Sequence, residues 1–192
     1  MNAQAAQAAT FRLLHARPGI FVIPNPWDAG SAKILAMLGF EALATTSAGF
    51  AFSVGKPDAE GAVDRHDTLA HARTNVSSTS LPVSADLENG FGDDPETCAA
   101  TIRLAAEAGL VGGSIEDATG DPSHPIYDFQ HAVERIAAAS AAAHALPFPF
   151  MLVARDENYL RGRPDPNDTI RRLQAFETAG PDVLFSPAPA RP

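Results

Sequence analysis

The chain has 192 residues, of which 45% are hydrophobic and 19% charged, as in an ordinary globular domain with a sizeable core. Its formal net charge of −9 argues against a nucleic-acid partner and against binding to an anionic membrane. Cys98 is the one cysteine, which excludes an intrachain disulfide and fits a reducing compartment. The sequence shows no apolar run long enough for a membrane span and no signal peptide, so a cytoplasmic location is expected.

Predicted helices and strands alternate along the chain. The opening stretch "MNAQAAQAATFRLLHA" is predicted to form an alanine-rich amphipathic helix. Apolar runs predict six strands, near residues 20–24, 42–46, 81–86, 111–116, 149–155 and 182–186. Helical spacing of apolar residues predicts the helices between them, over residues 29–38, 66–77, 95–108, 128–144 and 166–179.

This alternation indicates an α/β fold with a parallel sheet and right-handed crossovers. An open doubly wound sheet is one alternative, but no glycine-rich phosphate loop follows the first predicted strand. A (β/α)8 TIM-barrel type fold, as a single domain over residues 1–192, is favoured because acidic residues follow several different strands.

A closed barrel of this type has eight strands and about 250 residues. The chain ends just after the sixth predicted strand, so strands 7 and 8 are predicted to be missing. The sheet would then stay open, with unpaired edge strands and exposed apolar surfaces. We therefore expect a truncated chain, or one that a partner chain completes.

The stretch "LPVSADLENGFGDDPE", residues 81–96, places two carboxylates at the end of a predicted strand. Asp86 and Glu88 end the apolar run, and a glycine turn then carries the chain into a helix. Asp94 is predicted to cap that helix, with Pro95 at its first position. Charge at the end of a strand is costly unless it has a partner, so either a solvated loop or a metal site is expected here.

Candidate site residues follow the other predicted strands too. They are Asn25, Trp27 and Asp28; Thr45 to Gly49, with a loop running to Asp58; Glu116 and Asp117; Arg155, Asp156 and Glu157; and Ser186. In a parallel barrel these positions converge at one mouth, where several carboxylates repel one another unless a cation is present. The all-oxygen set favours Mg²⁺ or Mn²⁺ over zinc. Arg155 offers a planar fork for a carboxylate or phosphate.

Other reactive residue types are less favoured as site residues. The six histidines lie on predicted helices or in the loop near residue 120, and none of them follows a strand. Cys98 lies on the apolar face of a predicted helix, which favours a core thiol over a nucleophile. No nucleophile-elbow pattern surrounds Ser47, so substrate contacts are favoured over nucleophilic attack.

Several motifs, in this order, resemble the isocitrate lyase/phosphoenolpyruvate mutase superfamily over about residues 20–187. The stretch "NPWDAGSAKILAMLGFEALATTSAGFAFSVGKPD" resembles its first two barrel strands, and "SADLENGFGD" resembles its metal motif. "GSIED" and "VARDENYL" resemble its fourth and fifth strand ends. The resemblance implies a Mg²⁺ ion at the barrel mouth that holds a 2-oxo acid such as pyruvate, oxaloacetate or glyoxylate, or a related phosphonate.

The resemblance also implies roles for individual residues. The metal is expected to be held by four carboxylates, directly by the first and through water by the others: Asp86, Asp58, Glu88 and Glu116. The substrate is expected to contact one guanidinium and three residues that follow the second strand: Arg155, Ser47, Ala48 and Gly49. Arg155, Ser47 and Asp58 are the expected catalytic residues.

We therefore expect a Mg²⁺-dependent lyase-like or phosphonomutase-like enzyme that cleaves a C–C or C–P bond beside a 2-oxo acid through a metal-stabilised enolate. The complete family form is expected to be a homo-oligomer. The fifth strand departs from the family's usual Ala-Arg-Thr-Asp, because Asp156 and Glu157 follow Arg155 here.

The loop after the fourth strand departs from the family as well. It reads "EDATGDPSHPIYD", with neither the lysines nor the cysteine of the Lys-Lys-Cys-Gly-His-like loop that many lyases of the family carry. The alternative is therefore a non-catalytic or truncated relative that binds metal and a small carboxylate without turnover. Within this loop, residues 118–127 resemble the family's gating loop, and an ordinary surface loop is the other interpretation.

Overall fold

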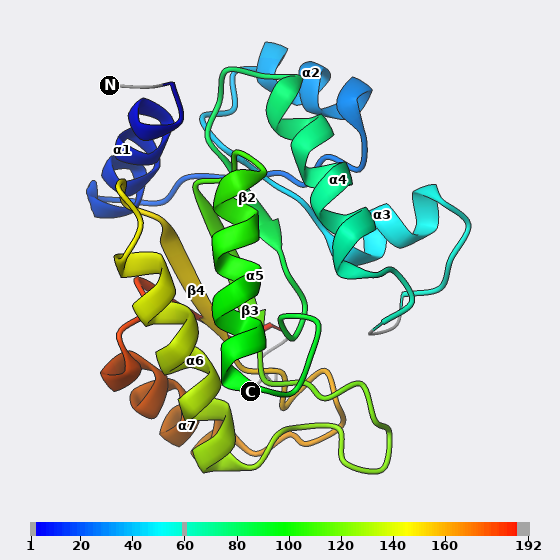
Figure 1. Ribbon diagram of the computed structural model, residues 1–192, viewed down its shortest axis with the longest axis vertical. Helices are drawn as coiled ribbons and strands as arrows, with labels where there is room; N and C mark the ends of the chain where they lie inside the picture. The colour runs from blue at the N-terminus through cyan, green and yellow to red at the C-terminus, as the bar shows by residue number, and fades with distance from the viewer. Residues whose placement is uncertain (1–2, 59–60, 188–192) are drawn as a thin grey trace.

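The computed structural model describes residues 3–58 and 61–187 (Figure 1). Its centre is a parallel sheet with the strand order β1-β2-β3-β4-β5. The strands are β1 (Leu43–Ala44), β2 (Val83–Asp86), β3 (Gly112–Glu116), β4 (Met151–Arg155) and β5 (Val183–Phe185). The helices are α1 (Ala3–Ala16), α2 (Ala29–Met37), α3 (Ser47–Ser53), α4 (Arg65–Ser77), α5 (Pro95–Glu107), α6 (Phe129–His144) and α7 (Pro166–Ala179).

The predicted α/β fold with a parallel sheet is confirmed. Every pair of neighbouring strands is parallel, and strands follow one another in the sheet in chain order. A doubly wound sheet reverses its strand order at one point, and this sheet does not. The described residues form five strands, in which β1 and β5 are the two edges. That the chain is an incomplete barrel, and that the complete form is a homo-oligomer, stay predictions.

The strand predicted at residues 20–24 is wrong. This segment runs beside β1, but the described backbone bonds join the two only from Ala44 N–H to the Pro24 carbonyl, at 3.2 Å. Pro24 and Pro26 have no N–H to donate, so a regular ladder cannot form at this end. Ile20 is 94% exposed, which also separates the segment from a buried strand.

The chain after β1 differs from the prediction as well. The predicted strand 42–46 is reduced to two residues, and α3 begins where a loop was expected. Thr46 accounts for the early helix, because its backbone is extended and its hydroxyl accepts a bond from the Gly49 N–H at 3.3 Å. That is the geometry of an N-cap.

The helices α2, α4, α5, α6 and α7 begin and end within one residue of their predicted positions, and α1 covers the described part of the predicted first helix. Asp94 lies at the N-cap of α5 with Pro95 at its start, as expected, although its side chain makes no capping bond. Gly39, Gly109 and Gly180 follow helices with φ of 87°, 95° and 95°, which only glycine adopts freely. The positions of aspartate, proline and glycine in the sequence therefore predict most of the helix boundaries.

Helices cover the sheet on one face, and α1 closes one end of it. Figure 1 shows α5 and α6 side by side in front of the strands. From α1, Gln4 donates to the carbonyls of Ala106 and Leu110, which precede β3. The Phe11 ring packs so close to Gly112 that a Cβ there would lie 2.9 Å from it. Because α1 fills the amino-terminal end of the strands, the carboxyl-terminal end is left for a site.

Part of the surface around α2 is apolar. Ile34, Met37 and Leu38 on and after α2 are exposed, Met37 to 87%. Exposed apolar groups were expected at the edges of an open sheet. In the described part of the chain, no helix combines the length and apolar character needed to cross a membrane.

Candidate functional site

A polar cavity of about 250 Å³ lies at the carboxyl ends of β2, β3 and β4. Its lining side chains come from α3, from the segment before α4 and from the strand ends: Ser47, Asp58, Glu88, Glu116, Arg155, Glu157, Leu160 and Arg161. The structure therefore brings together side chains that lie more than one hundred residues apart in the sequence. Six of them are candidate site residues from the sequence, all except Leu160 and Arg161.

Asp86 lies at the edge of this cavity and is held from several sides. Its Oδ2 accepts the Ser47 hydroxyl at 2.8 Å and the Ser47 N–H at 3.3 Å, and its Oδ1 accepts the Glu88 N–H at 3.1 Å. Arg155 Nη1 lies 3.6 Å from Oδ2. The carboxylate that ends β2 is thus fixed in orientation, as a metal ligand must be.

Glu88 occupies a strained turn after β2. Its φ is 47°, a conformation that is uncommon for a residue with a side chain. Its Oε2 accepts the Gly61 N–H at 3.3 Å. Burial raises the pKa of Glu88 to about 7, and the charges of Asp86 and Asp58 add to the effect. A nearby cation would therefore stabilise the ionised form of Glu88.

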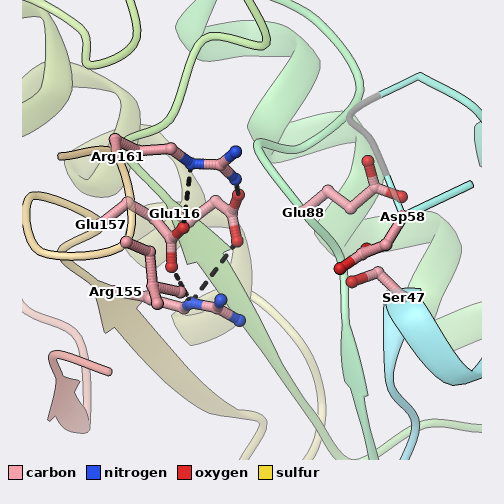
Figure 2. Close-up of a pocket in the computed structure, with 8 residues that line it drawn as sticks. Ser47, Asp58, Glu88, Glu116, Arg155, Glu157 and Arg161 are labelled. Carbon is pink, nitrogen blue, oxygen red and sulfur yellow. Dashed lines mark hydrogen bonds and ion pairs between the residues drawn. The ribbon is translucent and has the colours of Figure 1, made fainter. Parts of the chain in front are cut away.

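Arg155 and Arg161 join two buried glutamates on the other side of the cavity. Arg155 Nε lies 2.6 Å from Glu157 Oε1 and 3.5 Å from Glu116 Oε2. Arg161 pairs with the same two glutamates, at 3.2 Å from Glu157 and 3.5 Å from Glu116. Figure 2 shows this group facing Ser47, Asp58 and Glu88 across the cavity.

The site carries more negative than positive charge. Burial raises the pKa of Glu116 well above its ordinary value, and the charges of Asp86 and Glu157 raise it further. Two guanidinium groups, those of Arg155 and Arg161, lie among five carboxyl groups. When all are ionised, the site therefore has an excess of three negative charges. The five carboxyl groups are those of Asp58, Asp86, Glu88, Glu116 and Glu157. Such an excess favours a bound cation or protonated carboxyl groups.

The residues at the start of α3 have backbone donors that are already engaged. The Ser47 N–H points to Asp86, and the Gly49 N–H points to Thr46. Ala48 lies between them in the first turn of α3. The structure thus places Ser47 against Asp86, with Ala48 and Gly49 next to it in the helix, and contacts from the Ser47 and Gly49 N–H groups to a substrate would require rearrangement.

One charged residue of the cavity escaped sequence reasoning, because Arg161 was not considered. Glu157 was a candidate at the end of its strand, but no role was assigned to it. Their four-residue spacing was a usable signal, because an acidic and a basic side chain at that distance pair within one helical turn. What the sequence could not show is that Glu157 also takes the Nε of Arg155.

A buried layer supports the ends of β3 and β4 from below. Asp117 Oδ1 accepts the Glu157 N–H at 2.8 Å, and its Oδ2 pairs with Arg172 from α7 at 3.2 Å. Burial raises the pKa of Asp117 to about 7, and Asp156 adds to this. Arg172 also holds Asp168, at 2.8 Å. Asp117 and Asp156 therefore lie beneath the cavity and do not line it.

A tight metal-like cluster occurs elsewhere in the described chain. The group of three potential ligands whose donor atoms lie within 4.8 Å of one another is Asp64, His66 and Asp67, all exposed at the start of α4. Asp64 acts there as a helix cap, accepting the Asp67 N–H at 2.8 Å. The predicted ligands are more widely spaced than this, as expected where most reach a metal through water.

The less favoured candidates lie where the sequence predicted. The histidines occupy α1, α4, α6 and the 120s loop, and none follows a strand. Cys98 is fully buried in the core, and burial raises the pKa of its thiol. Asn25 donates to the Ala44 carbonyl at 3.0 Å, and Asp28 caps α2. Asn25 and Asp28 were candidate site residues, and the structure gives them structural partners outside the cavity instead.

The loop at residues 118–127 folds back on itself. An isolated antiparallel bridge joins Ala118 to Ile126, and the Thr119 hydroxyl donates to the His124 carbonyl at 2.5 Å. Asp121 accepts the Ser123 N–H at 2.8 Å. The loop has no regular element apart from that bridge, and whether it is a gate stays a prediction.

Comparison with known proteins gives consistent matches. A family model described as phosphoenolpyruvate phosphomutase matches residues 11–192. The 2,3-dimethylmalate lyase of Eubacterium barkeri is 29% identical over 187 residues, covering 95% of this chain and 63% of that protein.

Two solved structures have the same architecture. A crystal structure described as a putative lyase/mutase from Burkholderia cenocepacia J2315 has 64% identity and a TM-score of 0.94, covering 97% of this chain and 66% of the other. A phosphonopyruvate hydrolase in complex with oxalate and Mg²⁺ has 26% identity and a TM-score of 0.83, covering 97% and 63%. The chain thus spans less than two thirds of the curated relative's length.

Proposed function

Because this chain belongs to the isocitrate lyase/phosphoenolpyruvate mutase superfamily, whose members include lyases and phosphonomutases of small acids and phosphonates, we propose that it is a Mg²⁺-dependent enzyme of this kind. Its substrate would be a small 2-oxo acid or a related phosphonate. The observation that carries the proposal is one cavity in which Arg155 faces oxygen ligands from three different strand ends.

The donor set fits a hard divalent cation. All the candidate ligands are carboxylates, which suit Mg²⁺ and also Mn²⁺. When its carboxyl groups are ionised, the site has three excess negative charges that attract a cation; burial first, and then the neighbouring charges, raise the pKa of Glu88 to about 7 without one. When bound, such a cation supplies Lewis-acid stabilisation of the enolate oxygen formed by C–C or C–P cleavage.

Residues of the chain divide the remaining work between them. Asp86 is the direct ligand, since its two oxygens are held in place by Ser47 and the Glu88 N–H. The other metal-facing carboxylates act through water: Asp58, Glu88 and Glu116. Arg155 binds and orients the substrate carboxylate at the wall opposite to Glu88.

Substrate oxygens are proposed to contact Ser47, Ala48 and Gly49 in the first turn of α3, which Ser47 joins to Asp86. Ser47 and Asp58, with Arg155, complete the proposed catalytic set. Residues 118–127 contain neither cysteine nor lysine. A reaction that needs a cysteine acid or base from this loop is therefore disfavoured.

The proposal is tested by a substrate panel with Mg²⁺: oxaloacetate, phosphonopyruvate, 2-methylisocitrate and 2,3-dimethylmalate. Turnover of one of them is expected, and both a chelator and Arg155→Met should abolish it. Surface variant Arg103→Met is the control, because that guanidinium pairs only with exposed Glu96 among the described contacts. Oxalate binding without any turnover would favour a non-catalytic relative, and neither binding nor turnover would contradict the proposal.

A further inference from the structure

The turn at residues 89–93, which follows the metal-facing Glu88, directs its backbone carbonyls away from the cavity. They accept bonds from two helices. The Asn89 carbonyl accepts from Cys98 Sγ at 3.7 Å, and the Gly90 carbonyl accepts from the Thr101 hydroxyl at 2.8 Å, both on α5. Those of residues 89, 92 and 93 accept from α6.

Most of the α6 bonds come from one side chain. Arg135 Nη1 donates to the carbonyls of Gly92, at 2.6 Å, and Asp93, while Nη2 donates to that of Asn89. Arg135 is 1% exposed, and no carboxylate is among its described partners. A buried guanidinium is costly, and an apolar side chain of similar volume often stabilises a core better. What an apolar residue cannot do is bind three carbonyls of one turn.

An aromatic residue completes the arrangement. The Arg135 guanidinium lies 4.0 Å from the ring centroid of Tyr127, a cation–π contact. The Tyr127 hydroxyl donates to Asp93 Oδ1 at 2.5 Å and accepts from Asn89 Nδ2 at 3.4 Å. Arg135 and Tyr127 therefore each contact both Asn89 and Asp93, the two ends of the turn.

The turn needs such support because its backbone is strained. Glu88 and Phe91 have φ of 47° and 63°, and non-glycine residues keep these costly values only where the surroundings enforce them. Released from its anchors, the turn would relax toward ordinary φ values. The orientation of Glu88 would then change, and with it the N–H that Asp86 Oδ1 accepts.

We propose that Arg135, with Tyr127 beside it, is a positioning residue that fixes the turn at residues 89–93 and thereby orients Asp86 and Glu88 for cation and substrate binding. The role in binding rests on the proposed function. The claim that Arg135 and Tyr127 hold the turn in place depends only on the contacts described above.

Four variants test this. Arg135→Lys keeps the charge but cannot reach three carbonyls, Arg135→Met removes all three bonds, and Tyr127→Phe removes one hydroxyl and leaves the ring. Ser140→Ala is the matched control, because Ser140 is buried on the same helix and donates to a carbonyl at 2.6 Å, that of Gly180, far from the turn. Hydrogen exchange is measured at the amides of Glu88, Gly90 and Phe91, relative to β3 amides.

Exchange at these amides is expected to rise at least about tenfold in both Arg135 variants and less in Tyr127→Phe, with no change in Ser140→Ala. Calorimetry with Mg²⁺ and oxalate should show affinity weakened about 10–100-fold, as for other residues that orient metal ligands. Tyr127→Phe, the variant with the smallest loss of contacts, keeps the test valid if the Arg135 variants do not fold.

Unchanged hydrogen exchange at the turn amides would contradict the claim that Arg135 holds the turn in place. Faster exchange with unchanged affinity would overturn the positioning role. If the unaltered protein binds neither Mg²⁺ nor oxalate, the proposed function fails and the role in binding fails with it, while the exchange data still decide whether Arg135 holds the turn.

Discussion

Replacing Asp168 by asparagine tests the buried layer beneath the cavity. Asp168 lies in the first turn of α7, where Oδ2 accepts from Arg172 Nε at 2.8 Å and from Asn158 at 3.1 Å. Oδ1 accepts from Arg171 at 2.7 Å. Asp168→Asn keeps the shape but removes the charge, which leaves the buried Arg172 with one carboxylate partner, Asp117.

The pKa of Asp168 sets the size of the effect. Burial alone would raise this pKa, but the bonds from Arg172, Arg171 and Asn158 outweigh burial and lower it from 3.8 to about 2. That difference corresponds to roughly 2.5 kcal/mol, and solvent screening reduces it to about 1–2 kcal/mol. Since the folded state favours the ionised form, this stabilisation is present above about pH 4 and is lost as the pH falls toward 2.

This stabilisation is measured as the difference in the free energy of unfolding between the parent protein and Asp168→Asn. Both are unfolded with urea at a series of pH values between 7 and 3. The variant is expected to be about 1–2 kcal/mol less stable at pH 7, and the gap should narrow toward pH 3. Asp67→Asn is the control: this first-turn carboxylate of α4 is exposed, so a change below about 0.5 kcal/mol is expected. A gap that is absent at pH 7, or equal at pH 7 and 3, would refute the reasoning.

Three further outcomes are expected. Gly90→Ala should cost about 2–4 kcal/mol in urea unfolding, because φ is 82° and a Cβ would lie 2.9 Å from the buried thiol of α5, whereas Gly39→Ala, with open space around it, should cost about 1 kcal/mol; equal losses would contradict this. Glu157→Gln should release Arg155 and tighten oxalate binding about threefold in calorimetry, and weaker binding would show that the glutamate orients the arginine. Proteolysis within residues 118–127 should slow when Mg²⁺ and oxalate are added, and unchanged cutting would count against a gate.

Local sequence signals were enough for the helices and for the parallel sheet. Proline, aspartate and glycine mark the ends of α5 and α7, and apolar spacing marks the face that each helix buries. The failures lie in two segments where a second local signal overrides the apolar pattern of a strand. Residues 20–24 look like a strand by composition, yet Pro24 and Pro26 prevent a ladder. Thr46 begins a helix only because its hydroxyl turns to cap it.

The sequence predicted which residues meet at the candidate site, but not how they interact there. Strand ends in a parallel sheet converge, so the sequence alone could bring Asp86, Glu88 and Glu116 to one mouth. It could not show that Arg155 is already engaged by carboxylates, since that depends on the conformation of Glu157. Nor could it show Arg135 beneath the turn, because an arginine on a helix is normally solvated.

The most direct test of the proposed metal site is calorimetry of oxalate with the parent protein, Asp86→Ala and Glu116→Ala, each with and without Mg²⁺. The parent should bind oxalate only when Mg²⁺ is present. Asp86→Ala should lose that binding, whereas Glu116→Ala should weaken it and retain some, because its ligand role is through water. If Asp86→Ala binds like the parent while Glu116→Ala does not, or if the parent binds oxalate equally well without Mg²⁺, the metal site proposed at Asp86 is contradicted.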